Sequence, residues 1–393
     1  MRNLQGRGRA RLRNRAITTV LAAIVLIVGG VSCGEPQTPP PAQKVVRLGS
    51  LVPLSGSNGP TGQRVVQAQQ MAVKEANEAG GILGHRVELV IKDDACDDGT
   101  AVVGANEMVG QDITLSVGGA CSKATVPVLK VFRDAGIPMI IPASNSTDLL
   151  APGYDSVFLL SGTSKIEAQR AIGAMGRLGI SRVDVVDDGT SFPQTLADAA
   201  VASLRKPGST TSLAAQNTLS QGATSYPRIV ASVLREHADM VFFTGYYPEA
   251  ATLIRDLRAA KYAGKIMLAD AGTDPTLFTL LSPAEAEGVY GLTLPLAQFE
   301  PRATAWAARY KAAYGKEPGP FTMQGYDAVR LGLNAIQRAG SLDRTAIRKA
   351  IASTTPGDVA LLSGPARFNP DGTEVNPTFI LLQINNGTFA LAP

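Results

Sequence analysis

Two short segments combine cysteine, carboxylate and hydroxyl side chains in a way that suits the binding of a small polar ligand. Residues 92–97 read KDDACD, and residues 118–122 read GGACS. Each segment follows a predicted strand, and a predicted helix begins directly after the second. We place Ser122 at the N-cap of that helix, where a serine hydroxyl and free backbone N–H groups suit a carboxylate. The sequence therefore predicts an anion-binding pocket at this helix start.

The cysteines of the two segments, Cys96 and Cys121, lie 25 positions apart. A disulfide that closes a loop of this length stabilises a fold by roughly 3–4 kcal/mol. We therefore predict a Cys96–Cys121 disulfide. Disulfides form outside the reducing cytosol, so this prediction requires that the protein is exported.

The N-terminal segment has the pattern of an export signal. Residues 1–15 carry six arginines and no acid, residues 16–28 are apolar, and small residues precede Cys33. An apolar run of about 13 residues is too short to span a bilayer, which needs roughly 20. The small residues before Cys33 are similar to a bacterial lipobox, with Gly30 where leucine is usual.

We therefore expect residues 1–32 to be a lipoprotein signal peptide and Cys33 to be lipidated, so that the protein is anchored on the extracytoplasmic face of the cell membrane. Residues 33–43, rich in proline, would form a tether. Plain secretion, with cleavage near Ser32, is the alternative. Removal of residues 1–32 takes away six basic residues and leaves 31 basic against 33 acidic, a net charge of −2. No basic patch remains that would favour binding to nucleic acid.

The remaining residues alternate short β-branched runs with amphipathic runs, which predicts an α/β fold with parallel sheets covered on both faces. The predicted strands are 45–51, 86–92, 114–118, 137–141, 157–160, 183–186, 240–243, 266–268 and 378–384. The predicted helices are 62–79, 100–111, 123–135, 166–178, 192–204, 226–236, 249–260, 302–314, 323–339 and 343–351.

Ligands of such folds bind beyond the carboxyl ends of the strands. Non-periodic segments rich in Gly, Ser and Asn fall at these ends in both halves of the chain, at 54–59, 119–122, 142–145, 189–192 and 245–249. Because both halves contribute, we expect the ligand to lie between two lobes.

Taken together, these segments resemble the leucine/isoleucine/valine-binding proteins, which are the receptors of branched-chain amino acid ABC importers. The resemblance runs from about residue 45 to the C-terminus. Its most specific parts are DDACD at 93–97, the 25-position cysteine spacing and GYYPE at 245–249, with weaker support from Ser55-Gly56 and Gly364-Pro365.

The resemblance implies the type I periplasmic binding protein fold, in which two Rossmann-like lobes are joined by a three-strand hinge and close over the ligand. By analogy, residues 44–161 and 291–375 would form the first lobe. Residues 162–290 and 376–393 would form the second.

In the first lobe, the resemblance implies that Ser122 binds the carboxylate of an amino acid through its hydroxyl and N–H. The Ala143 carbonyl would accept from the ligand ammonium, and Asn145 would contact both charged groups, with Ser144 between them. Threonine is usual where Asn145 stands.

In the second lobe, the acid that pairs with the ammonium falls on Asp270, where the branched-chain receptors carry glutamate. Two second-lobe aromatics fall on Tyr246 and Phe192, the latter where tyrosine is expected. The position of the aromatic residue expected in the first lobe is occupied by Thr61, so that ring is absent here. The clamp for an α-amino acid is therefore largely present, while the pocket for its side chain is changed.

Each site residue also has a purely structural interpretation. Ser122 could only cap a helix, Asp270 could be a solvated loop acid, and Phe192 and Tyr246 could pack inside their lobe. The acids at 93–98 lack the spacing of a calcium-binding loop, so we expect them to have structural or solvated roles and expect no metal.

An enzyme would need a nucleophile or base with partners. The chain has only two histidines, His85 and His237, and lacks the G-x-S-x-G, Walker A, H-E-x-x-H and C-x-x-C motifs. We therefore expect a non-catalytic receptor without cofactor, monomeric, that delivers an amino acid or a related small carboxylate or amide to an ABC permease and its ATPase. A ligand sensor of the same fold that signals to a membrane partner, and an extracellular enzyme, remain as alternatives.

Overall fold

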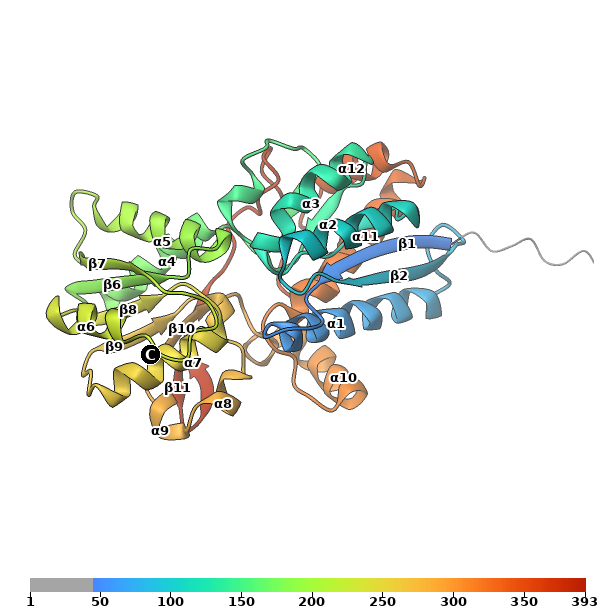
Figure 1. Cartoon of the computed structure of the whole chain (residues 1–393). Helices are drawn as coiled ribbons and strands as arrows, with labels where there is room; N and C mark the ends of the chain where they lie inside the picture. Colours follow the sequence, from blue (N-terminus) through green and yellow to red (C-terminus); the bar gives the residue numbers. More distant parts are fainter. Residues whose placement is uncertain (1–44) are drawn as a thin grey trace, which may run out of the picture. The chain divides into compact units, whose positions relative to one another are not determined.

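The computed structural model describes residues 45–393. The expected signal peptide (1–32), the tether (33–43) and Cys33 lie outside this part. The described residues form two α/β lobes, each built around one sheet (Figure 1). In residues 45–393, no helix combines the length and the apolar character that a membrane crossing requires.

The first lobe contains a five-stranded sheet in the order β2-β1-β3-β4-β5, and every strand pair in it is parallel. Its strands are β1 (Val45–Val52), β2 (Arg86–Asp93), β3 (Leu115–Ser116), β4 (Met139–Ile141) and β5 (Val157–Leu159). Side chains of a strand alternate between faces. Val46 and Leu48 of β1 accordingly pack on one side and Leu51 on the other. Both faces are thus apolar, and helices cover both.

The helices of the first lobe divide between these faces. They are α1 (Gly59–Glu78), α2 (Asp98–Gly110), α3 (Ser122–Asp134), α10 (Thr304–Tyr314), α11 (Thr322–Ala339) and α12 (Arg344–Ala352). Helices α2 and α3 share one apolar core with Leu51, while α1, α10, α11 and α12 share the other with Val46 and Leu48. Three helices from beyond residue 300 therefore complete a lobe that begins at residue 45.

The second lobe contains a seven-stranded sheet in the order β12-β11-β10-β9-β8-β6-β7. Its strands are β6 (Arg182–Asp187), β7 (Ser212–Thr218), β8 (Met240–Phe243), β9 (Lys265–Leu268), β10 (Tyr290–Thr293), β11 (Ile380–Asn385) and β12 (Thr388–Leu391). β11 pairs antiparallel with β10 and with β12, so this sheet is mixed, whereas the other pairs are parallel. Its helices are α4 (Ser164–Arg177), α5 (Ser191–Leu204), α6 (Pro227–Arg235), α7 (Tyr247–Ala259), α8 (Leu277–Leu280) and α9 (Pro283–Ala286).

The chain passes between the two sheets three times. The crossings follow β5, follow β10, and precede β11. The type I arrangement expected from the resemblance is confirmed, with two sheets and three connections. The residue limits expected for the lobes stay a prediction.

Three strands escaped the sequence interpretation. β7 is a half-exposed edge strand with a polar sequence, and β10 is only four residues long. β12 follows β11 through the turn Asn386-Gly387, whose two residues both have positive φ, as a two-residue hairpin requires. We expected the chain to end in one strand, and it ends instead in a hairpin.

The start of α1 lies unusually close to the end of β1, because Gly62 faces the chain at Pro53. A Cβ atom at Gly62 would lie 1.8 Å from the Pro53 carbonyl oxygen. Only glycine allows this approach. It holds the neighbouring Thr61 beside the carboxyl ends of the strands, at the edge of a cavity that is described below.

Candidate binding site between the lobes

One cavity is lined by residues of both lobes at the carboxyl ends of their strands. The cavity is narrow: the space that the centre of a water-sized molecule can occupy in it is about 30 Å³. Its lining includes all seven residues expected to contact ligand: Ser122, Ala143, Ser144, Asn145, Phe192, Tyr246 and Asp270. Their contact with a ligand stays a prediction, but the fold brings all of them to one place.

Helix α3 presents its N-terminus to this cavity. The N-cap is Cys121 rather than Ser122, and no side chain caps the helix, so the expected N-cap role of Ser122 is wrong. Ser122 is instead the first helical residue, and its Oγ accepts the backbone N–H of Ser146 at 3.3 Å. A hydroxyl that accepts this bond keeps its own proton for donation to a ligand oxygen. The position suits a carboxylate because the N–H groups of a first helical turn have no partner within the helix.

The loops that follow β3 and β4 are joined beside this helix start. The Ser144 N–H donates to the Gly119 carbonyl at 3.2 Å, and the Ser144 Oγ lies 2.9 Å from the Thr125 Oγ1. Ser144 is 1 % exposed and Ala143 is 5 % exposed. Ser144 therefore fixes the backbone that carries Ala143 and Asn145 to the cavity.

The opposite side of the cavity is acidic. Asp270 follows β9 and is buried, as is Asn145, whose Nδ2 donates to the Asp270 Oδ2 at 3.2 Å. The same Nδ2 donates to the Oε2 of Glu167 on α4 at 3.0 Å, and the Glu167 Oε1 accepts the Asp270 N–H at 3.0 Å. Asp270 is thus a buried acid, and its interpretation as a solvated loop residue is wrong.

The environment of these acids opposes their ionisation. Burial raises the pKa of Asp270 to about 7. Burial, together with the neighbouring Asp270, raises the pKa of Glu167 well above its usual range. Among residues 45–393, neither carboxyl forms an ion pair with a Lys, Arg or His side chain. A cationic group of a ligand would stabilise the ionised form of both carboxyl groups.

Two aromatic rings form another wall. Phe192 and Tyr246 meet edge to face, with ring centroids 6.1 Å apart, at the N-terminal ends of α5 and α7. Burial and nearby carboxylates raise the pKa of Tyr246 well above its usual range, so this phenol stays neutral. Both rings belong to the apolar core as well as to the cavity, so packing and ligand contact are compatible at these positions.

The end of the cavity near α1 is polar. Thr61 donates a hydrogen bond to the Asp274 Oδ2 at 2.5 Å, and Arg64 forms an ion pair with the same carboxylate. The Tyr247 hydroxyl donates to the Ser57 carbonyl nearby. These contacts join the first lobe to the second without any ligand atom. They also place a hydroxyl and a carboxylate at the position where the resemblance implied an aromatic ring.

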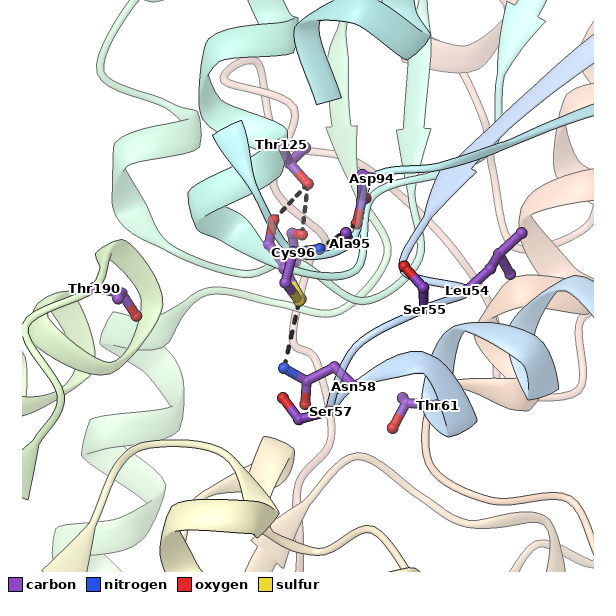
Figure 2. The surroundings of a disulfide bond; sticks show 12 residues. Leu54, Ser55, Ser57, Asn58, Thr61, Asp94, Ala95, Cys96, Thr125 and Thr190 are labelled. Atoms are coloured by element: carbon purple, nitrogen blue, oxygen red, sulfur yellow. Dashed lines mark hydrogen bonds between the residues drawn. A yellow bond between two sulfur atoms is a disulfide. The ribbon is translucent and has the colours of Figure 1, made fainter. Parts of the chain in front are cut away.

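Cys96 and Cys121 form a disulfide, with their Cα atoms 5.4 Å apart. Figure 2 shows the Asn58 amide directed at the Cys96 sulfur, to which its Nδ2 donates at 3.4 Å. Because Asn58 and Cys121 both line the cavity, the disulfide links the β2 loop to the α3 start at its rim.

The neighbouring acids have structural roles, as expected. Asp93 accepts backbone N–H groups of Leu54 and Ala95, and Asp97 caps α2 by accepting from the Thr100 N–H. Asp94 is buried, and this raises its pKa to about 7. Within residues 45–393, no three His, Cys, Asp or Glu side chains are arranged to hold a metal ion.

The family model described as periplasmic binding protein matches residues 45–388, and the chain therefore belongs to the periplasmic binding protein family. The chain is 28 % identical to Leu/Ile/Val-binding protein homolog 3 of Brucella melitensis biotype 1, over 87 % of this chain and 92 % of that protein. It is 30 % identical to an amino acid binding protein of Pseudomonas aeruginosa, over 76 % of this chain and 80 % of that protein. These relatives are binding proteins rather than enzymes.

Solved structures confirm the fold. A leucine binding protein from Thermotoga maritima superposes with a TM-score of 0.82 at 24 % identity, covering 88 % of this chain and 98 % of its own. A solute binding protein from R. palustris in complex with benzoate gives a TM-score of 0.79 at 19 % identity, covering 88 % and 95 %. At these identities the likeness concerns the fold alone.

Sequence reasoning missed three polar residues of this region: Glu167, Arg64 and Asp274. Each stands outside the recognised motifs. Glu167 lies on a helix of ordinary amphipathic pattern, and Arg64 lies one turn beyond the start of α1. A charged residue on the buried face of a predicted helix is the signal that would have indicated Glu167 and Arg64. Asp274 lies in the loop between β9 and α8, where no such signal exists.

Proposed function

We propose that this protein is the extracytoplasmic substrate-binding receptor of an ABC importer and that it captures an α-amino acid between its lobes. One observation carries the proposal: a single cavity has a helix N-terminus with the Ser122 hydroxyl on one side and the buried acid Asp270 on the other. These two sides complement the carboxylate and the ammonium of an α-amino acid. The family membership and the names of the relatives support the same class of ligand.

The proposed ligand has a small or branched side chain. Its side chain would extend toward the Phe192–Tyr246 wall and the polar end at Thr61, where a hydroxyl group of the ligand could also bond. A ligand that touches both lobes favours the closed arrangement, since only differential contacts shift a conformational equilibrium. We assign residues 44–161 and 294–375 to the first lobe and 162–293 and 376–393 to the second. The expected limit between 290 and 291 moves to the end of β10, because Tyr290–Thr293 pairs within the second sheet, while α10–α12 pack on the first.

A thermal-shift screen of the purified protein tests the ligand class. The panel contains L-leucine, L-isoleucine, L-valine, L-threonine and L-alanine, together with their amides, the corresponding des-amino carboxylates, and benzoate. We expect one or more of the amino acids to raise the Tm most, since a ligand present at 100 times its Kd stabilises the folded state by about 2.7 kcal/mol. A response to carboxylates or benzoate but to no amino acid would contradict the proposal in favour of a carboxylate receptor.

We also propose that the protein works as a monomer, anchored to the membrane by lipid on Cys33, and delivers its ligand to a permease and ATPase. The apolar run and the small residues before Cys33 support the anchor.

Cys33→Ala should release the protein from the membrane fraction or leave its signal uncleaved, as immunoblots of fractionated cells would show. A wild-type protein that is fully soluble and free of lipid would contradict it. Loss of uptake on deletion of an adjacent permease gene would separate import from sensing.

A further inference from the structure

Glu167 is fully buried and does not line the cavity, but it contacts two residues that do, Asn145 and Asp270. It projects from the first turn of α4, and its carboxyl group meets that of Asp270 at a single amide nitrogen, the Nδ2 of Asn145. Asn145 comes from the first lobe, and both acids belong to the second. The contact therefore spans the two lobes at the acidic side of the cavity.

These bonds fix the orientation of the Asn145 amide. An asparagine NH₂ group has two donors, and here one is directed at each carboxyl group. The reversed amide would turn its oxygen toward both carboxyl groups, which is unfavourable. Within residues 45–393, no group donates to the Asn145 Oδ1, although Asn145 lines the cavity. The side chain thus offers an acceptor to a ligand, and its donors are already occupied.

This orientation revises the role expected for Asn145, which was contact with both charged groups of the ligand. A side chain with both N–H groups occupied cannot also donate to a carboxylate. It can accept from an ammonium, beside Asp270 and the Ala143 carbonyl. The carboxylate then depends on Ser122 and the start of α3.

The surroundings of Glu167 and Asp270 also favour a cationic group of the ligand at this place. The Tyr246 phenol, which is neutral, lies near Asp270, and the other charged groups near that phenol are the acids Asp94, Asp188 and Glu249. On α4 itself, Lys165 and Arg170 are exposed to solvent. The pair consequently has no internal counterion in the described part of the chain.

We propose that Glu167 is a specificity-determining residue of the ammonium site: it holds the Asn145 amide with its oxygen toward the ligand and, with Asp270, supplies the negative charge that selects a cationic group. This inference rests on the proposed function as an amino acid receptor. It also implies a proton balance. A buried pair of acids without a counterion retains a proton near neutral pH, and an incoming ammonium displaces that proton into the solvent.

Isothermal calorimetry on the full mature protein tests the inference. The probes are L-leucine, L-valine, L-threonine and L-alanine, each compared with its des-amino carboxylate, at pH 6, 7 and 8. Repeating each titration in two buffers of different ionisation enthalpy counts the protons released. We expect wild type to release up to about one proton and to bind the amino acid more tightly as pH rises, by up to tenfold per unit, because the free protein binds more protons than the complex.

In Glu167→Gln, we expect amino acid affinity at pH 8 to fall about tenfold, with little change for the des-amino carboxylate and with fewer protons released. Glu167→Asp, which keeps the charge, should restore the proton release at least in part. Asp184→Asn is the matched control, since Asp184 is also buried in the second lobe but bonds to Asn217 instead of facing the cavity. It should leave selectivity and proton release unchanged.

The outcomes separate the two proposals. If an amino acid binds wild type without proton release and without pH dependence, or if Glu167→Gln retains full selectivity, the role of Glu167 is contradicted and the receptor function stands. The wild-type measurement decides this even if the variant fails to fold. If none of the four amino acids binds wild type, the proposed function fails, and the inference about Glu167 fails with it.

Discussion

Replacement of Asp270 by alanine should weaken amino acid binding by roughly 30-fold or more. Asp270 is the buried acid that lines the cavity opposite Ser122, and the proposed ammonium would be desolvated beside it. Removal of one partner of a desolvated charged contact typically costs about 2–5 kcal/mol, because the remaining charge is left unpaired. At about 1.4 kcal/mol per decade of affinity, this corresponds to between about 30-fold and several thousandfold. Calorimetry on the purified variant measures the loss.

Ser122→Ala provides the comparison for the other end of the ligand. We expect a smaller loss, since the backbone N–H groups at the start of α3 remain after the hydroxyl is removed. Asp184→Asn controls for the removal of a buried acid elsewhere in the same lobe. If Asp270→Ala binds like wild type while Ser122→Ala is weakened, the ligand has no ammonium at Asp270, and a carboxylate or amide becomes the better candidate.

The second large effect is expected on stability, from removal of the Cys96–Cys121 disulfide. The double variant Cys96→Ala/Cys121→Ala should lose roughly 3–4 kcal/mol of the free energy of unfolding, the value for a closed loop of this length. Denaturant unfolding of oxidised wild type and of the variant measures the difference. Because the disulfide joins the rim of the cavity, ligand affinity should fall as well.

Reduction of wild type with dithiothreitol is the control for the loss of side-chain packing at the two sites. Reduced wild type and the double variant should unfold at similar denaturant concentrations. Non-reducing peptide mapping of exported protein should find the two cysteine peptides linked. Two free thiols there, or equal stability of the oxidised and reduced forms, would contradict the prediction.

The part of the site that sequence could predict is the part attached to strand ends. Ser122, Asn145, Tyr246 and Asp270 all follow short, largely buried strands, and parallel strands bring their carboxyl ends to one edge. The α/β class of the fold was predictable from the alternation of strands and helices along the chain. Strands without that signal, such as the polar edge strand β7, were not found.

Contacts made across the lobes were beyond this reasoning. Glu167 joins the site through Asn145 of the other lobe and through the Asp270 N–H, and Arg64 joins it through Asp274 of the other lobe. No local pattern encodes such pairs, since their partners are separated by 22 and 210 positions. The predicted N-cap of α3 was displaced by one residue, from Cys121 to Ser122, which is the usual uncertainty of a helix end.

The contacts of Asp274 with Arg64 and Thr61 bear on kinetics as well as affinity. They require no ligand atom, so they favour the joined lobes whether or not a ligand is bound. Each 1.4 kcal/mol that they contribute multiplies the ratio of joined to separated ligand-free molecules by about ten. In the proposed closure, ligand would enter molecules whose lobes are apart, so the apparent association rate would fall with that fraction, as would the rate of escape once the lobes have met. On this proposal, the contacts of Asp274 with Arg64 and Thr61 would set how quickly the receptor fills and how long it retains its ligand.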